Sequence, residues 1–291
     1  MLIAQITDTH VSAPGVGTCG GAVDSNARLG AAIEHLNALS PRPDCVLITG
    51  DLADQGNDEE YEEFVRLVEA IEMPVHFVIG NHDDRAVMVE HLDFPAPLPG
   101  GWLQYCVEDY DVRLILLDST NDVHHLAEFC GERLAWLRAR LAEQPERPTL
   151  VAIHHPPFNT GIAFLDAEGA AWADDLVALL GEHDNVQLVV SGHVHRPIQS
   201  VVGGVLANIC PSTAQQTTLD LAENPSVDSL FVLEPPAFQV HRINEGPVVT
   251  HTVPVGNYEG IVQVSAEARA GFATKDPRVI FAKRDHHSPS A

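Results

Sequence analysis

The sequence is poor in positively charged residues and in long apolar runs. Its 291 residues include 16 Lys and Arg against 41 Asp and Glu, which gives a formal net charge of −25. Such an acidic surface repels phosphate backbones and anionic lipids, so we expect neither a nucleic acid nor a membrane as a partner. No apolar run approaches the roughly 20 residues that cross a bilayer. Because a strand-like run begins at Leu2, a signal peptide is not expected either, and the sequence predicts a cytoplasmic protein.

Cysteine is also scarce. The chain has five cysteines, an odd number, and none of them lies in a CxxC spacing. A zinc–thiolate site or a full disulfide framework is therefore not expected, although one disulfide between subunits stays open. The hydrophobic content of 45% is enough to bury a substantial core, either as one large domain or as one domain with an appendage.

Apolar runs that are typical of buried strands alternate with helical patterns along the chain. The helical patterns begin at Ser25 and Asp58 and also cover residues 131–143 and 168–180. In the second half of the sequence, paired apolar runs predict additional hairpins. The alternation predicts an α/β fold of two stacked mixed β-sheets flanked by helices.

Five of the strand-like runs end in a burst of polar residues. The bursts are Asp8-x-His10, Gly50-Asp51, Gly80-Asn81-His82-Asp83, His154-His155 and Gly192-His193-x-His195. Ligands of such sheets collect at the carboxyl ends of the strands, so we expect these side chains to share one site.

The polar bursts offer carboxylate, imidazole and amide groups but no thiolate, and these donors suit Fe, Mn, Zn or Co. They are more numerous than one ion requires, whereas two divalent ions that share one carboxylate would use them all. A two-metal site holds a hydroxide at neutral pH and stabilises both oxygens of an in-line phosphoryl displacement, which predicts phosphoester hydrolysis. Two ions would also reverse the local negative charge and admit an anionic substrate.

The five bursts resemble the pattern of the calcineurin-like metallophosphoesterases, which is DxH, GD, GNH followed by Asp or Glu, a later histidine, and GHxH. The resemblance covers residues 2 to about 210, and GNHDD, HHPP and segment 161–166 look like bacterial class III cyclic nucleotide phosphodiesterases and glycerophosphodiesterases. It implies a four-layer α/β/β/α sandwich. We expect a catalytic domain over residues 1–255, with an oligomerisation hairpin or cap near 211–235, and a C-terminal extension and tail over 256–291. A homodimer or larger homo-oligomer is expected from the same likeness.

The resemblance also assigns roles to individual residues. It implies a first metal held by Asp8, His10 and His195, a second metal held by Asn81, His154 and His193, and Asp51 as the bridge between them. The nucleophile would be a metal-bridging hydroxide. His82 would act as the catalytic residue above the phosphate, and Asp83 would orient it. The expected substrate contacts are Asn81, His82 and His155. For His155 an equally open alternative is a position behind the metal ligands, where it would support them and not touch the substrate.

Three departures from relatives narrow the expected reaction. Protein Ser/Thr phosphatases have an arginine where GDLADQG has Gln55, which favours a singly charged diester over a monoester dianion. Purple acid phosphatases need a tyrosine where this chain has Asp54, so a ferric tyrosinate site is not expected. Glycerophosphodiesterases often have a histidine near Gln215. That difference leaves the choice between cyclic nucleotides and glycerophosphodiesters open.

The predicted function is therefore hydrolysis of a small soluble phosphodiester by a dinuclear metal centre. The alternatives are a phosphomonoesterase of the same superfamily and, less favoured, a non-catalytic scaffold. The identity of the metals, and the role of Arg196 as a phosphate contact or as the partner of a carboxylate, stay open.

Overall fold

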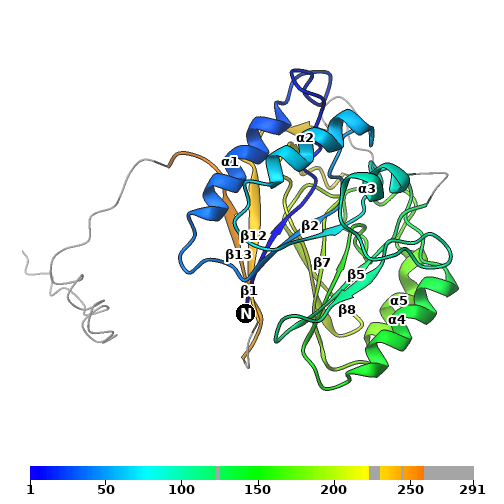
Figure 1. Ribbon diagram of the computed structural model, residues 1–291. Coiled ribbons are helices and arrows are strands. Elements are labelled where there is room, and N and C mark those ends of the chain that lie inside the picture. Colours follow the sequence, from blue (N-terminus) through cyan, green and yellow to red (C-terminus); the bar gives the residue numbers. More distant parts are fainter. Residues whose placement is uncertain (122–124, 223–229, 244–245, 259–291) are drawn as a thin grey trace, which may run out of the picture. The chain divides into compact units, whose positions relative to one another are not determined.

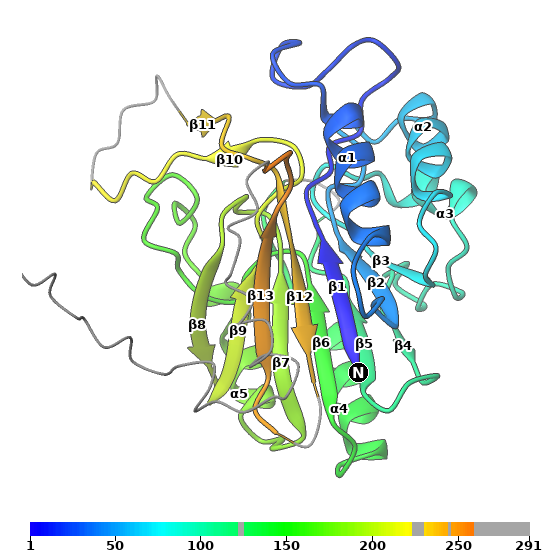
Figure 2. The same ribbon diagram turned by 90° about the vertical axis from the view of Figure 1, so that its left-hand side faces the viewer.

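The computed structural model describes residues 1–121, 125–222, 230–243 and 246–258. Residues Met1–Gly256 form one compact unit that contains every helix and strand in the described part of the chain. Figures 1 and 2 show the two sheets of this unit from two directions. Among the described residues, no helix combines the length and the apolar character that crossing a bilayer requires.

The first sheet has five strands in the order β13-β12-β1-β2-β3. Its strands are β1 (Leu2–Ile6), β2 (Cys45–Thr49), β3 (Val75–Val78), β12 (Ala237–Arg242) and β13 (Val249–Pro254). Strands β1, β2 and β3 are parallel, whereas β12 runs antiparallel to β1. The sheet is therefore mixed, as predicted.

The second sheet has six strands in the order β4-β5-β6-β7-β9-β8. Its strands are β4 (Tyr105–Val107), β5 (Arg113–Leu117), β6 (Thr149–Ile153), β7 (Val186–Ser191), β8 (Ile198–Val202) and β9 (Val205–Ile209). The four inner strands are parallel, and the two edge strands are each antiparallel to their neighbour.

Helices cover the outer face of each sheet. Helices α1 (Ser25–Asn37), α2 (Asp58–Val68) and α3 (Arg85–His91) pack on the first sheet, and α4 (Gly131–Glu143), η1 (Ala171–Ala173) and α5 (Asp174–Leu180) pack on the second. Leu47 of the first sheet and Leu188 of the second belong to one buried cluster that lies between the sheets. These contacts give the predicted order of layers, helix, sheet, sheet, helix.

Some expected elements differ in extent. The helix expected from residue 168 begins later, because the backbone of Gly169 is left-handed at φ +67° and one turn of η1 precedes α5. Helix α3 was not predicted, since its seven residues are too short for a helical pattern. In the segment expected as an oligomerisation hairpin, β10 (Gln216–Thr217) pairs with β11 (Phe231–Val232). Residues 223–229 and 259–291, which include most of the expected tail, lie outside the described residues.

Candidate metal centre

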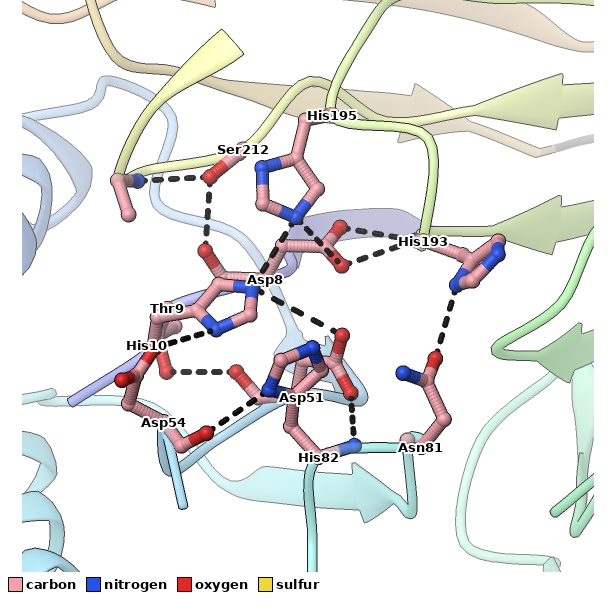
Figure 3. Close-up of polar contacts among 12 residues, drawn as sticks. Asp8, Thr9, His10, Asp51, Asp54, Asn81, His82, His193, His195 and Ser212 are labelled. Carbon is pink, nitrogen blue, oxygen red and sulfur yellow. Dashed lines mark hydrogen bonds and ion pairs between the residues drawn. The ribbon is translucent and has the colours of Figure 1, made fainter. Parts of the chain in front are cut away.

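The predicted ligand residues come together just beyond the carboxyl ends of strands from both sheets. Asp8 and Asp51 follow β1 and β2, which are parallel neighbours in the first sheet. His154 and His193 follow β6 and β7, which are parallel neighbours in the second. Parallel strands end at the same edge, so stacking the two sheets brings both sets of side chains into one cluster. Figure 3 shows Asp51 near the middle of that cluster.

On one side of the cluster, four buried side chains face one another. The Nε2 atoms of His10 and His195 are 3.0 Å apart. His195 Nε2 lies 3.4 Å from Asp8 Oδ1, and His10 Nε2 lies 3.7 Å from Asp51 Oδ2. Each of the four residues offers a ligand atom within 4.8 Å of the others.

On the other side, an amide oxygen meets two imidazoles. Asn81 Oδ1 lies 2.8 Å from His193 Nδ1 and 3.1 Å from His154 Nε2. His154 Nε2 is also 3.3 Å from Asp51 Oδ2. Asp51 therefore contacts both sides of the cluster, which is the place that the sequence predicts for a bridging carboxylate.

The hydrogen bonds of the histidines show that the cluster fits a cation. His10 Nδ1 lies 3.2 Å from the Asp54 carboxylate, and His195 Nδ1 lies 2.8 Å from the Gln215 carbonyl oxygen. Both partners only accept hydrogen bonds, so both Nδ1 atoms carry the hydrogen. In neutral rings the two Nε2 atoms then present lone pairs to each other and to carboxylates. Lone pairs that converge in this way favour a bound positive ion, and this nitrogen and oxygen set suits Fe, Mn, Zn or Co.

The pKa values of the cluster residues also favour a bound cation. Burial alone would lower the pKa of His154, but the charge and hydrogen bond of Asp51, together with the charge of Asp8 and the Thr49 carbonyl, outweigh burial and raise that pKa to about 9. Burial would likewise raise the pKa of Asp51, whereas the neighbouring His154 holds it well below its usual value. The buried carboxylate thus stays charged and attracts whichever cation lies beside it.

The backbone is held in an unusual conformation at most of the predicted ligands. Among the described residues, six that are not glycine have positive φ, and five of them are predicted ligands: Asp8, His10, Asp51, His193 and His195. Each such residue costs about 1 kcal/mol or more, and strain of this kind gathers at functional sites. Gly50 has φ +97°, and a Cβ atom there would lie 2.3 Å from Nδ1 of His154. Only glycine fits at that position.

His82 lies beside the cluster. Its backbone N–H donates to Asp51 Oδ1 at 2.9 Å, and its ring packs edge-on against His10 with centroids 4.7 Å apart. Ring nitrogen Nδ1 lies 2.8 Å from the carbonyl oxygen of Asp54. Asp54 therefore contacts both His10 and His82, a positioning role that the sequence did not reveal, because one of the two contacts uses a backbone atom.

Asp83 does not have the partner that the sequence suggests. Its buried carboxylate accepts hydrogen bonds from the backbone N–H groups of Leu52, Ala53 and Gly80 and from the hydroxyl of Tyr61. Burial, reinforced by the charge of Asp51, raises its pKa to about 6. The carboxylate turns toward these donors, while the His82 ring is held by Asp54. In this structure Asp83 connects the loops after β2 and β3 and does not orient His82.

Three residues whose role was open now have partners. His155 is buried, with Nδ1 2.8 Å from Ser119 Oγ and its ring centroid 4.5 Å from that of His193. Arg196 donates to the carbonyl oxygen of Thr217 and pairs with Glu234, so it is the partner of a carboxylate. Gln215 uses its backbone oxygen to hold His195.

Comparison with known proteins gives a consistent result. Residues 1–197 match the family model of the calcineurin-like phosphoesterases. A probable glycerophosphodiester phosphodiesterase of Arcobacter nitrofigilis is 33% identical over 263 residues, which cover 89% of this chain and 95% of that protein. A cAMP/cGMP dual specificity phosphodiesterase of Mycobacterium tuberculosis is 32% identical over 227 residues, which cover 76% of this chain and 70% of that protein. Among solved structures, a dimetal phosphatase from Danio rerio shares the fold, with a TM-score of 0.65 at 15% identity over 88% of this chain and 99% of that one.

Proposed function

This chain belongs to the calcineurin-like phosphoesterase family, and we propose that it is a metal-dependent phosphodiesterase that hydrolyses small phosphodiesters. The observation that carries the proposal is the convergence of imidazole and carboxylate groups around Asp51. The relatives named above act on glycerophosphodiesters or on cyclic nucleotides, and both substrate classes are candidates here.

In this proposal the cluster holds two divalent ions. Asp8, His10 and His195 would hold one ion, Asn81, His154 and His193 would hold the other, and Asp51 would be shared between them. Divalent ions at such a site supply Lewis-acid stabilisation of the phosphoryl oxygens and an activated water. The oxygen and nitrogen ligands are compatible with Fe, Mn, Zn or Co.

His82 is the proposed proton donor to the leaving group. Its Nδ1 faces the carbonyl oxygen of Asp54, which accepts a hydrogen bond, so Nε2 is the nitrogen that can exchange a proton with substrate. The alkoxide that leaves a diester is strongly basic, and protonation by a positioned imidazole contributes about 10²–10⁴-fold to such a step.

The absence of a positive charge at position 55, beside the cluster, favours a diester substrate over a monoester. Position 55, where related monoester phosphatases have an arginine, carries the neutral Gln55, whose amide donates to Asp54 at 2.9 Å. A monoester dianion would lack that cationic partner, whereas a singly charged diester needs it less. Asn81 and His155 are the other proposed substrate contacts.

The test is a side-by-side assay of bis(p-nitrophenyl) phosphate and p-nitrophenyl phosphate with manganese-reconstituted protein. We expect a higher specific activity on the diester, and a loss of at least 100-fold in His82→Ala with metal content retained. His251→Ala, at an exposed position on β13, is the matched control and should be fully active. A higher activity on the monoester would refute the diester assignment. The absence of both bound metal and hydrolysis would point to a non-catalytic scaffold.

We also propose that the segment 211–235 forms an oligomer contact. Among its described residues, four apolar side chains are exposed: Leu219, Leu221, Phe231 and Leu233. Light scattering should show a homodimer or a larger homo-oligomer, and a monomer at all concentrations would refute the proposal. The domain limits at 255 and 256 and the cytoplasmic location stay predictions.

A further inference from the structure

Two cavities border the cluster on either side of His125. The larger, of about 780 Å³, reaches Asn81, and the smaller, of about 490 Å³, reaches His155 and His193. We propose that the smaller cavity binds the nucleobase of a nucleoside phosphodiester. The proposal rests on the phosphodiesterase function above and narrows its substrate class.

The walls of the smaller cavity are aromatic. Phe158, Phe164 and Trp172 line it, and all three are half-buried. Phe158 and Trp172 pack against the core of the second sheet, and Trp172 meets the His155 ring edge-on at 6.3 Å. These rings are therefore fixed surfaces. A base that stacks on such a ring binds roughly 5- to 150-fold more tightly than it does without the ring.

One of the residues that line the cavity, His155, is held by a buried hydroxyl group. Ser119 Oγ accepts a hydrogen bond from the backbone N–H of His155 and lies 2.8 Å from that residue's Nδ1. The hydroxyl hydrogen is then free to bond Nδ1, which places the ring hydrogen on Nε2. That nitrogen is buried, and the ring also interacts with the backbone of His125.

Charge distinguishes the two cavities. The charged residues that line the smaller one are Asp166 and Glu168, with no Lys or Arg among its described lining residues. Both carboxylate oxygens of Asp166 already accept hydrogen bonds. The donors are the backbone N–H and the hydroxyl of Thr160 and the backbone N–H of Gly161. A second anionic group on the substrate would be repelled there, while a neutral base is accepted. Among the residues that the structure describes, no Phe, Tyr or Trp lines the larger cavity, which includes the charged Arg85 and Glu90. The described lining therefore offers a base no stacking surface.

The smaller cavity is joined directly to the proposed phosphate site. His193 lines the cavity and also contacts Asn81 Oδ1 at 2.8 Å. One ligand can therefore place its phosphate at the metal cluster and its base between the aromatic side chains.

Binding of two matched products tests the proposal without requiring turnover. AMP and ribose 5-phosphate differ only in the base, and calorimetry on manganese-reconstituted protein measures each. We expect AMP to bind at least tenfold more tightly than ribose 5-phosphate. Trp172→Ala removes one wall, and Ala167→Trp fills the cavity from an exposed position that tolerates a large side chain. Both variants should abolish the preference for AMP.

The control is Ala178→Trp, at an exposed position on α5 outside the cavity, which should keep the preference. If Trp172→Ala does not fold, Ala167→Trp alone decides. Equal binding of AMP and ribose 5-phosphate to the wild type, or a preference that survives Ala167→Trp, would overturn the base site. Failure of the phosphodiesterase function is a separate result, seen as no hydrolysis of bis(p-nitrophenyl) phosphate by metal-loaded wild type.

Discussion

Removal of one hydroxyl group, in Tyr61→Phe, should weaken metal binding at a distance. The Tyr61 side chain is fully buried in α2 and donates to Asp83 Oδ1 at 2.8 Å. A hydrogen bond to a charged group contributes about 1.5–3 kcal/mol, and phenylalanine fills the same space. We therefore expect the free energy of unfolding of the metal-free protein to fall by about 2 kcal/mol.

The effect should extend to the ligands because of what Asp83 holds. Its oxygens accept the N–H groups of Leu52 and Gly80, which are the neighbours of Asp51 and Asn81. Without Tyr61 the carboxylate keeps only backbone donors and can shift, and both ligands shift with it. A chelator competition assay should show weaker metal binding by Tyr61→Phe, and urea unfolding gives the stability.

Tyr105→Phe is the matched control. Tyr105 is also largely buried, but its hydroxyl contacts the backbone N–H and carbonyl of Phe77, which are neutral groups. We expect a loss of about 1 kcal/mol and unchanged metal affinity. If the two variants lose equal stability and neither changes metal affinity, then Tyr61 does not support the ligand loops through Asp83.

Three further predictions follow from the structure. Gly50→Ala should deplete bound metal, as measured by elemental analysis, because the added Cβ atom would overlap the ring of His154. His193→Ala and His195→Ala should each weaken the binding of a different ion, so metal titrations of the two variants should lose different binding steps. Loss of the same step in both variants would contradict the assignment. Burial lowers the pKa of His241 to about 3, so the unfolded chain binds its proton first as the pH falls. The contribution of His241 to stability is therefore complete above about pH 6.5 and is lost as the pH falls toward 3, by up to about 1.4 kcal/mol per pH unit. In His241→Gln, the free energy of unfolding measured with urea should depend less on pH between pH 6 and 4.

The sequence predicted the fold and predicted that these polar residues would lie close together, but it did not predict how they are held. Apolar runs that end in polar residues are visible in the letters, and parallel strands place those ends side by side. By contrast, His195 is held by the carbonyl oxygen of Gln215 and His154 by that of Thr49. Every residue carries such an oxygen, so no residue type signals it. The partners of Asp83 were missed for a similar reason, because three of the four groups that donate to it are backbone N–H groups, which nearly every residue carries.

The histidine pair after β7 shows how the backbone turns a local spacing into two separate contacts. In an extended strand, residues two apart point to the same face, and both imidazoles would reach one site. Strand β7 ends at Ser191, however, and both His193 and His195 have left-handed backbones, at φ 68° and 55°. The chain turns at each of them while Val194 between them stays buried. The His193 ring therefore reaches Asn81 and the His195 ring reaches His10, on opposite sides of Asp51. In the proposed two-metal site, ions that share Asp51 would need ligands on both of its sides, and these two residues of one short loop would supply one to each.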